Sequence, residues 1–174
     1  DLKPDTRFGL ELNDVSDIVK DSNFRVFTGA IESGGSVRAI NAKGCGDSFS
    51  RREIDALVDF VKDYGAKGLA WIVVEEGGVR SPIAKFLDDE DLDAIKARLE
   101  AETGDLLLFV ADKDDIVYQA LGELRLELGR KLGLIDNEKY NLLWITEFPL
   151  LEYDEEEKRY VAKHHPFTSP MDED

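Results

Sequence analysis

Two predicted β-hairpins, each followed by an amphipathic helix, constrain the fold more than any other feature of the sequence. The first hairpin is expected over residues 24–44, where apolar residues alternate with polar or small ones on both sides of the turn sequence SGGS. The second is expected over 69–87, where an apolar run and the stretch VRSPIAKFL flank Gly77 and Gly78. Because Pro82 has no N–H group to donate to a strand ladder, this return strand is predicted to be an edge strand.

Three longer segments show a helical period with one apolar face. Residues 50–65 begin with Ser50 and Glu53, which have the spacing of a capping box. Residues 89–102 begin with an acidic run, and 113–132 carry an apolar residue at every third or fourth position. We therefore predict three amphipathic helices.

The remaining patterns complete an α+β fold. A short helix is expected within 1–23, a buried strand over 105–112, and a strand over 140–153 that ends or bends at Pro149. The resulting order predicts a two-layer sandwich, with a mainly antiparallel sheet and helices on one face. Three aromatic residues in the strands are expected in the core: Trp71, Phe86 and Trp144.

The charge of the chain limits its partners. The net charge is −16, with 22 basic and 38 acidic residues, which argues against a chain that grips nucleic acid by itself. The acidity is uneven, however, because 24–87 holds nine basic and eight acidic residues whereas 88–112 and 147–174 are strongly acidic. The first half could therefore approach RNA at modest cost if another part of a protein held it there.

Few residues carry a motif for chemistry. The sequence contains no Gly-rich phosphate loop, dinucleotide fingerprint, HExxH or CxxC, and we predict no catalytic residue and no metal site. The single cysteine, Cys45, excludes an internal disulfide and favours a reduced cytosolic setting; it is expected to be a loop residue rather than a reactive thiol. No apolar run approaches the roughly 20 residues that cross a membrane.

Both histidines are adjacent, at His164 and His165. Neighbouring side chains point to opposite sides of an extended strand, so the two are not expected to ligate one metal ion. From the residues alone, two interpretations stay open. One histidine could donate a hydrogen bond in a binding pocket, or both could be packed or surface residues.

Seven segments, in order along the chain, resemble bacterial-type aspartyl-tRNA synthetases. They are KPDTRFGLEL at 3–12, FTGA at 27–30, DYGAKGLAW at 63–71, SPIAKFL at 81–87, GDLLLFVAD at 104–112, LGELRLELGRKLGL at 121–134 and HHPFTSP at 164–170. The resemblance covers nearly the whole chain and implies a piece of a larger class II enzyme.

The resemblance also implies a domain organisation. Residues 24–112 would form the GAD insertion domain, similar to a β2-α-β2-α sandwich, and 1–23 would lead out of the catalytic core. Residues 113–146 would lead back towards the core, and 147–174 would be re-entering core strands.

In this family, the whole enzyme would attach aspartate to tRNA through an aspartyl-adenylate, using ATP and Mg2+. It would be a cytoplasmic homodimer, and this piece alone would be inactive and need no cofactor. His164 or His165 would line the aspartate pocket.

Two hypotheses follow for the insertion itself. It could lie near the tRNA, using basic residues of the near-neutral stretch: Arg25, Arg38, Arg51, Arg52 and Lys62. Alternatively, it could be a structural or protein-interaction domain without a direct role in RNA binding.

Overall fold

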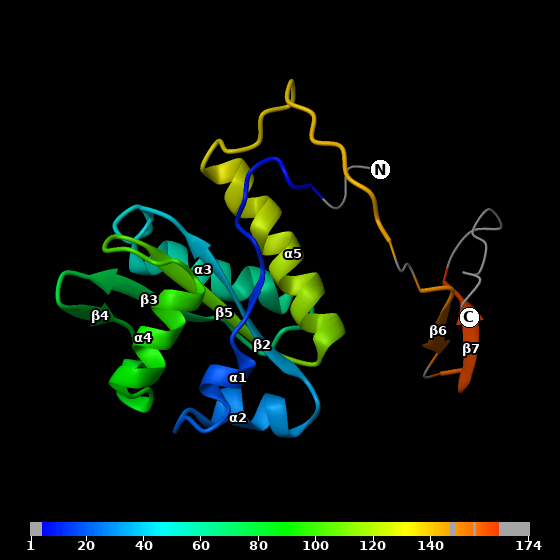
Figure 1. Cartoon of the computed structure of the whole chain (residues 1–174), viewed down its shortest axis with the longest axis horizontal. Helices are drawn as coiled ribbons and strands as arrows, with labels where there is room; N and C mark the ends of the chain where they lie inside the picture. Colours follow the sequence, from blue (N-terminus) through cyan, green and yellow to red (C-terminus); the bar gives the residue numbers. More distant parts are fainter. Residues whose placement is uncertain (1–4, 147–148, 155, 164–174) are drawn as a thin grey trace. The chain divides into compact units, whose positions relative to one another are not determined.

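The structure, a computed structural model, describes residues 5–146, 149–154 and 156–163, and Figure 1 shows their course. The chain forms two units, Asp1–Lys139 and Tyr140–Asp174.

An antiparallel sheet runs through the first unit. Its strands, in chain order, are β1 (Asn13–Asp14), β2 (Ser36–Ala42), β3 (Ala70–Glu75), β4 (Gly78–Arg80) and β5 (Leu106–Asp112). In space the order is β1-β2-β5-β3-β4, and every neighbouring pair is antiparallel. The mainly antiparallel α+β class is thus confirmed. The strand β4 lies at an edge and ends before Pro82, as the proline predicts.

Helices cover both faces of this sheet, not one face as the sequence pattern predicts. On one face lie α3 (Arg51–Lys62) and α5 (Asp114–Lys131). On the other lie α1 (Ser16–Val19), α2 (Arg25–Glu32) and α4 (Asp89–Arg98). Figure 1 shows the two groups on either side of β2 and β5, so the unit has three layers. A single turn of 3-10 helix, Ala84–Phe86, precedes α4.

The central strand β5 divides the core into two clusters. Leu106, Leu108 and Val110 point towards α3 and α5, whereas Leu107 and Phe109 point towards the opposite helices. All five side chains are at most 1% exposed. A strand buried on both faces needs apolar residues at every position, which explains the unbroken apolar run at 106–110.

Residues 25–32 form the helix α2, so the first predicted hairpin is wrong. In a strand, Phe24 and Phe27 would point to opposite faces because their spacing is odd. In the helix they lie one turn apart, and with Ile31 they pack into a single cluster. The two phenyl rings meet edge to face, with 4.7 Å between their centroids. The burial of this aromatic face decides the structure of the segment.

The three long amphipathic helices are confirmed. Ser50 Oγ accepts a hydrogen bond from the Glu53 amide, and the Glu53 carboxylate accepts one from the Ser50 amide, which completes the predicted capping box. In α5, the apolar stripe that the sequence shows is buried, from Val117 to Leu128.

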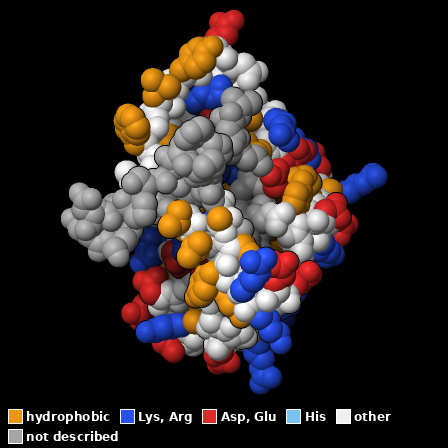
Figure 2. Space-filling view, turned by 90° about the vertical axis from the view of Figure 1, so that its right-hand side faces the viewer, with side chains coloured by type: hydrophobic (Ala, Val, Ile, Leu, Met, Phe, Trp, Pro, Cys, Tyr) orange, Lys and Arg blue, Asp and Glu red, His pale blue; other side chains and the backbone are white. Residues whose placement is uncertain are grey.

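The second unit contains one hairpin, β6 (Leu151–Asp154) paired with β7 (Arg159–Ala162). The predicted strand over 140–153 is wrong for most of its length, because the described residues between 140 and 150 form no strand and β6 begins only at Leu151. Trp144 is 94% exposed, so its expected place in the core is also wrong, whereas Trp71 is buried and Phe86 is half-buried. On the face that Figure 2 presents, apolar side chains reach the surface among charged ones.

Candidate nucleic-acid interface

His164 and His165 lie outside the residues that the structure describes. The five predicted RNA-proximal residues, in contrast, all lie within the described part of the chain.

Three of the five basic residues lie on α3. Arg51 and Arg52 start the helix, and Lys62 ends it. The Arg51 guanidinium pairs with Asp55 at 3.1 Å, and Lys62 Nζ pairs with Asp59 at 2.9 Å. Exposed pairs of this kind stabilise a helix only slightly, but they offset the positive charge that a phosphate would meet.

Arg38 interacts with other residues of the domain. Its guanidinium lies 2.9 Å from the Asp14 carboxylate of the neighbouring strand β1 and 4.8 Å from the centre of the Tyr118 ring on α5. The side chain is only 19% exposed. This arginine ties β1, β2 and α5 together, which leaves little of its charge for a partner outside the domain.

Arg25 begins α2, on the opposite face of the sheet from α3. It is exposed and forms no ion pair within the described part of the chain. The structure therefore separates the five predicted residues into three places and does not bring them together into one basic patch.

A groove beside α2, which we call the α2 groove, brings Arg25 together with two other cations. It encloses about 670 Å³ between α2, the segment 67–70 and the end of β5. The buried apolar residues that line it are Phe27, Leu69, Ile83 and Phe109. The basic residues that line it are Arg25, Lys67 and Lys113. Sequence reasoning missed both lysines, because they lie 46 positions apart and meet only through the pairing of β3 with β5.

Asp112 is the acidic residue of this groove and is 5% exposed. Its Oδ1 accepts a hydrogen bond from the Lys113 amide at 2.9 Å and lies 3.7 Å from Lys67 Nζ. Its Oδ2 is buried without a hydrogen-bond partner. A buried carboxylate oxygen without a donor is costly in free energy, so this atom marks a place where a donor from outside would be favourable.

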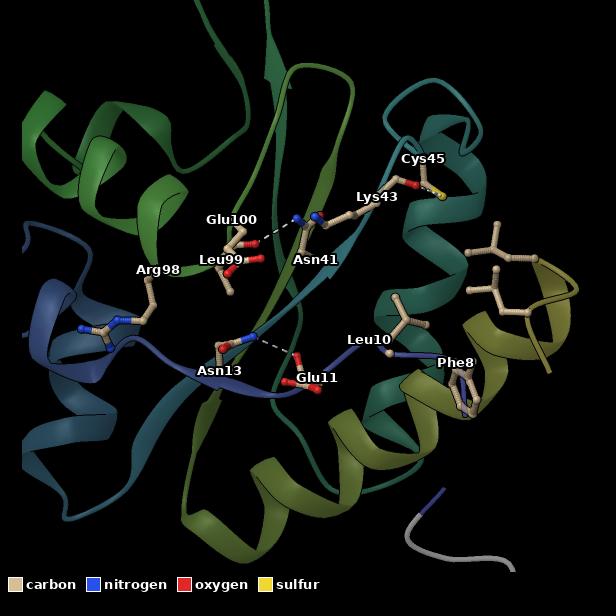
Figure 3. A pocket seen from close by; sticks show the side chains of 13 residues that line it. Phe8, Leu10, Glu11, Asn13, Asn41, Lys43, Cys45, Arg98, Leu99 and Glu100 are labelled. Carbon is tan, nitrogen blue, oxygen red and sulfur yellow. Dashed lines mark hydrogen bonds between the residues drawn. The ribbon is translucent and has the colours of Figure 1, made fainter. Parts of the chain in front are cut away.

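A second hollow, also of about 670 Å³, lies between the 8–13 segment, the end of β2 and the end of α4 (Figure 3). Asn41 stands at its wall, and its Nδ2 donates to the Leu99 carbonyl at 3.1 Å and to Asp105 Oδ2 at 2.9 Å. Both partners are acceptors, which fixes the orientation of the Asn41 amide.

Asp105 fixes the loop between α4 and β5, next to Asn41. Burial raises its pKa, but hydrogen bonds from the Glu102 and Gly44 amides and from Asn41 outweigh this effect, and the net pKa lies below the ordinary value. The network holds the ends of β2, α4 and β5 together, and it uses the polar groups for structure rather than for a ligand.

Cys45 lines the same hollow and is 6% exposed. Burial, with a smaller effect from Asp105, raises the pKa of its thiol. A reactive cysteine needs a lowered pKa, so the environment agrees with the predicted loop residue.

Two further observations concern the described residues. They contain no group of three histidine, cysteine or acidic residues placed to hold a metal ion. None of their helices has both the length and the apolar character that a membrane crossing requires.

Comparison with known protein families identifies the family of this chain. The family model described as the GAD domain matches residues 27–121, and the chain belongs to this family.

The resemblance to aspartyl-tRNA synthetases is also confirmed. The chain is 63% identical over 172 residues to the aspartate–tRNA(Asp/Asn) ligase of Geobacillus sp. strain WCH70, and 59% identical to that of Caldanaerobacter subterraneus subsp. tengcongensis. It is 58% identical to the aspartate–tRNA ligase of Staphylococcus carnosus strain TM300. Each match covers 99% of this chain and 29% of the relative, so the chain spans less than a third of the length of these proteins.

Proposed function

We propose that this chain is the GAD insertion domain and adjoining core segment of an aspartate–tRNA ligase. The observation that carries the proposal is 58–63% identity over 172 residues to proteins of that name. The whole enzyme would use ATP and Mg2+ to form aspartyl-adenylate and then transfer aspartate to tRNA. We place it in the cytoplasm as a homodimer.

The proposed boundaries follow the resemblance. Residues 24–112 are the insertion domain, 1–23 and 113–146 connect it to the catalytic core, and 147–174 belong to the core. The exposed side chains of Tyr140, Leu142 and Trp144 support this assignment, since a segment with apolar residues 85–94% exposed needs a further surface to cover it.

In the aspartate pocket, His164 or His165 would donate a hydrogen bond to the substrate. An imidazole suits this task because it donates through a ring N–H in either protonation state. The reaction itself would depend on positioning and on stabilising charge at the reacting phosphate, and we assign no described residue of this chain to those steps.

For the insertion, we propose a place near the tRNA. The support is the cationic α2 groove in a chain of net charge −16. A structural or protein-interaction role is the second candidate. It is favoured by the ion pairs of Arg38, Arg51 and Lys62, which occupy three of the five predicted RNA-proximal residues.

Two assays test the proposed function. A full-length protein that carries this sequence is expected to show aspartate-dependent ATP–pyrophosphate exchange and to charge tRNA, whereas the 174-residue chain alone shows neither. Replacing His164 or His165 with Ala in the full-length protein should raise the KM for aspartate. Exchange that does not depend on aspartate would contradict the proposal. Removing residues 13–131, which comprise the sheet and the helices on both of its faces, distinguishes the two roles, because a merely structural insertion leaves the KM for tRNA unchanged.

A further inference from the structure

The α2 groove combines three features that bear on what it could bind. Its floor is apolar, its edge carries three cations, and one buried acceptor atom lacks a donor. Each feature restricts the chemistry of an occupant, and together they describe a single class of ligand.

The cations come from three separate elements. Arg25 begins α2, Lys67 lies in the segment before β3, and Lys113 follows β5. Neither Arg25 nor Lys113 has an ion-pair partner within the described part of the chain, and Lys67 lies 3.7 Å from Asp112 at 84% side-chain exposure. These three cations therefore keep most of their charge for an anionic group from outside.

The apolar part of the groove has room for a flat ring. A Cβ atom added at Gly29 would meet no atom within 4 Å, so the wall that α2 forms is open at this position. Val26 on the same helix is 54% exposed, and Pro82 also lines the groove. Apolar surface of this kind stabilises a planar base when the base leaves water.

The unpartnered Oδ2 of Asp112 needs an N–H or O–H donor. Nucleobases carry N–H donors on their edges, and ribose carries a 2′-hydroxyl. Such a donor would satisfy this oxygen, which belongs to a residue that lines the groove.

We propose that the α2 groove binds an unpaired nucleotide of RNA, with its base against Val26 and Pro82 and its phosphates against Arg25, Lys67 and Lys113. This inference rests on the proposed function, which supplies RNA as the anionic partner. It goes beyond that function by replacing the scattered basic residues of α3 with one surface on the other side of the sheet.

Fluorescence anisotropy of a labelled 12-nucleotide oligoadenylate RNA, titrated with the 174-residue chain from 20 to 150 mM NaCl, tests the proposal. Three phosphate contacts predict a slope of about −2 for log K against log salt, at about −0.7 per contact for single strands. A 12-base-pair RNA duplex should bind at least about fivefold more weakly, because its bases are not available to the groove.

Two variants test the two halves of the groove. Replacing Lys67 and Lys113 with Gln should lower the affinity about tenfold at 50 mM salt and reduce the slope to about −0.7. Gly29→Leu should lower the affinity about fivefold without changing the slope, because it fills the apolar part and leaves the cations in place. Circular dichroism melting establishes that each variant is folded.

The matched control is Arg51→Gln with Arg52→Gln, which removes two cations from α3 on the opposite face. The proposal predicts a change of less than about twofold at 50 mM salt, since these residues lie outside the groove. Equal losses for the control and the lysine pair would overturn it, as would equal binding of the duplex or no binding at 20 mM NaCl.

Binding of an acidic peptide with apolar residues, but not of the RNA, would show that the groove is a protein-docking surface. None of these results depends on ATP–pyrophosphate exchange, so a failure here is distinguishable from a failure of the proposed function.

Discussion

The guanidinium of Arg125 holds the backbone carbonyl of Gly9 with two N–H groups, Nη2 at 2.6 Å and Nε at 2.9 Å. Nε also reaches the Leu10 carbonyl at 3.1 Å. Gly9 and Leu10 both have positive φ angles, 66° and 54°, a conformation that is unfavourable for leucine. Arg125 therefore fixes a strained turn of the N-terminal segment against α5, along which this segment runs in Figure 1.

Arg125→Ala should lower the free energy of unfolding by about 2 kcal/mol, because two backbone carbonyls lose a charged donor. Arg125→Lys should recover only part of this loss, since an ammonium group cannot present the same planar set of donors. Urea denaturation followed by circular dichroism measures both values. Arg52→Ala, an exposed change on α3, is the control, and an equal loss for it would show that the turn contributes nothing specific.

Substitution by alanine is expected to have opposite effects on stability at two glycines of α5, one of which lies in the same contact region. A Cβ at Gly129 would lie 2.9 Å from the Phe8 ring and 3.1 Å from Ile135, so Gly129→Ala forces these side chains to shift and should cost about 1–3 kcal/mol. At Gly122 nothing lies within 4 Å, and Gly122→Ala should stabilise the helix by about 0.5–1 kcal/mol. Thermal melting compares the two variants. Equal shifts in Tm would contradict the close packing at Gly129.

The hydrogen-bond network of Asp105 predicts a pH dependence of stability. The folded-state pKa of Asp105 lies below its unfolded value, so the unfolded chain binds the proton more readily. The stabilisation is complete above the unfolded pKa and is lost as pH falls through the folded pKa.

Asp105→Asn should therefore cost about 2–3 kcal/mol at pH 7, where three N–H donors lose a charged acceptor. The difference from the wild type should shrink as the pH is lowered below about 4, the ordinary range of an aspartate pKa. Urea denaturation at a series of pH values measures it, with the exposed Glu76→Gln as control. A difference that stays constant to the lowest pH would exclude the carboxylate charge as the cause.

The capping box of α3 gives a local prediction. Ser50→Ala removes the acceptor for the Glu53 amide and should cost about 1 kcal/mol. Ser48→Ala, two positions earlier in the exposed loop, should change stability by less than about 0.5 kcal/mol. If the two variants melt together, the cap does not stabilise the helix.

The sequence predicts the elements whose signals are local. The Ser50–Glu53 spacing and the apolar stripe from Val117 to Leu128 are sufficient to identify α3 and α5. For residues 24–31, alternation and helical spacing compete, and the outcome depends on the Phe24–Phe27 pair packing against Phe109 across the sheet. This contact is tertiary, so the local pattern alone does not predict it.

The position of the helices has a similar explanation. The apolar run at 106–110 predicts a buried strand. Because each face of β5 is apolar, helices are needed on both faces of the sheet. Trp144 is predicted in the core but is exposed, because an apolar side chain is buried only where another surface covers it.

The candidate site was less predictable than the fold. Of the five predicted basic residues, only Arg25 lies in the α2 groove. Its two companions, Lys67 and Lys113, are single lysines in short loops, and only the register of β3 on β5 brings these loops together. Arg38 shows why composition misleads, because Asp14 and Tyr118 engage its charge within the fold.

In the proposed arrangement, this domain contacts RNA through the α2 groove, and the chemistry takes place elsewhere in the whole enzyme. The most direct measurement compares tRNA charging with ATP–pyrophosphate exchange in a full-length protein that carries this sequence, with Lys67 and Lys113 both replaced by Gln. We expect the KM for tRNA to rise about fivefold, because phosphate contacts are lost, while aspartate-dependent exchange is unchanged. An unchanged KM for tRNA, or a parallel fall in both activities, would contradict it.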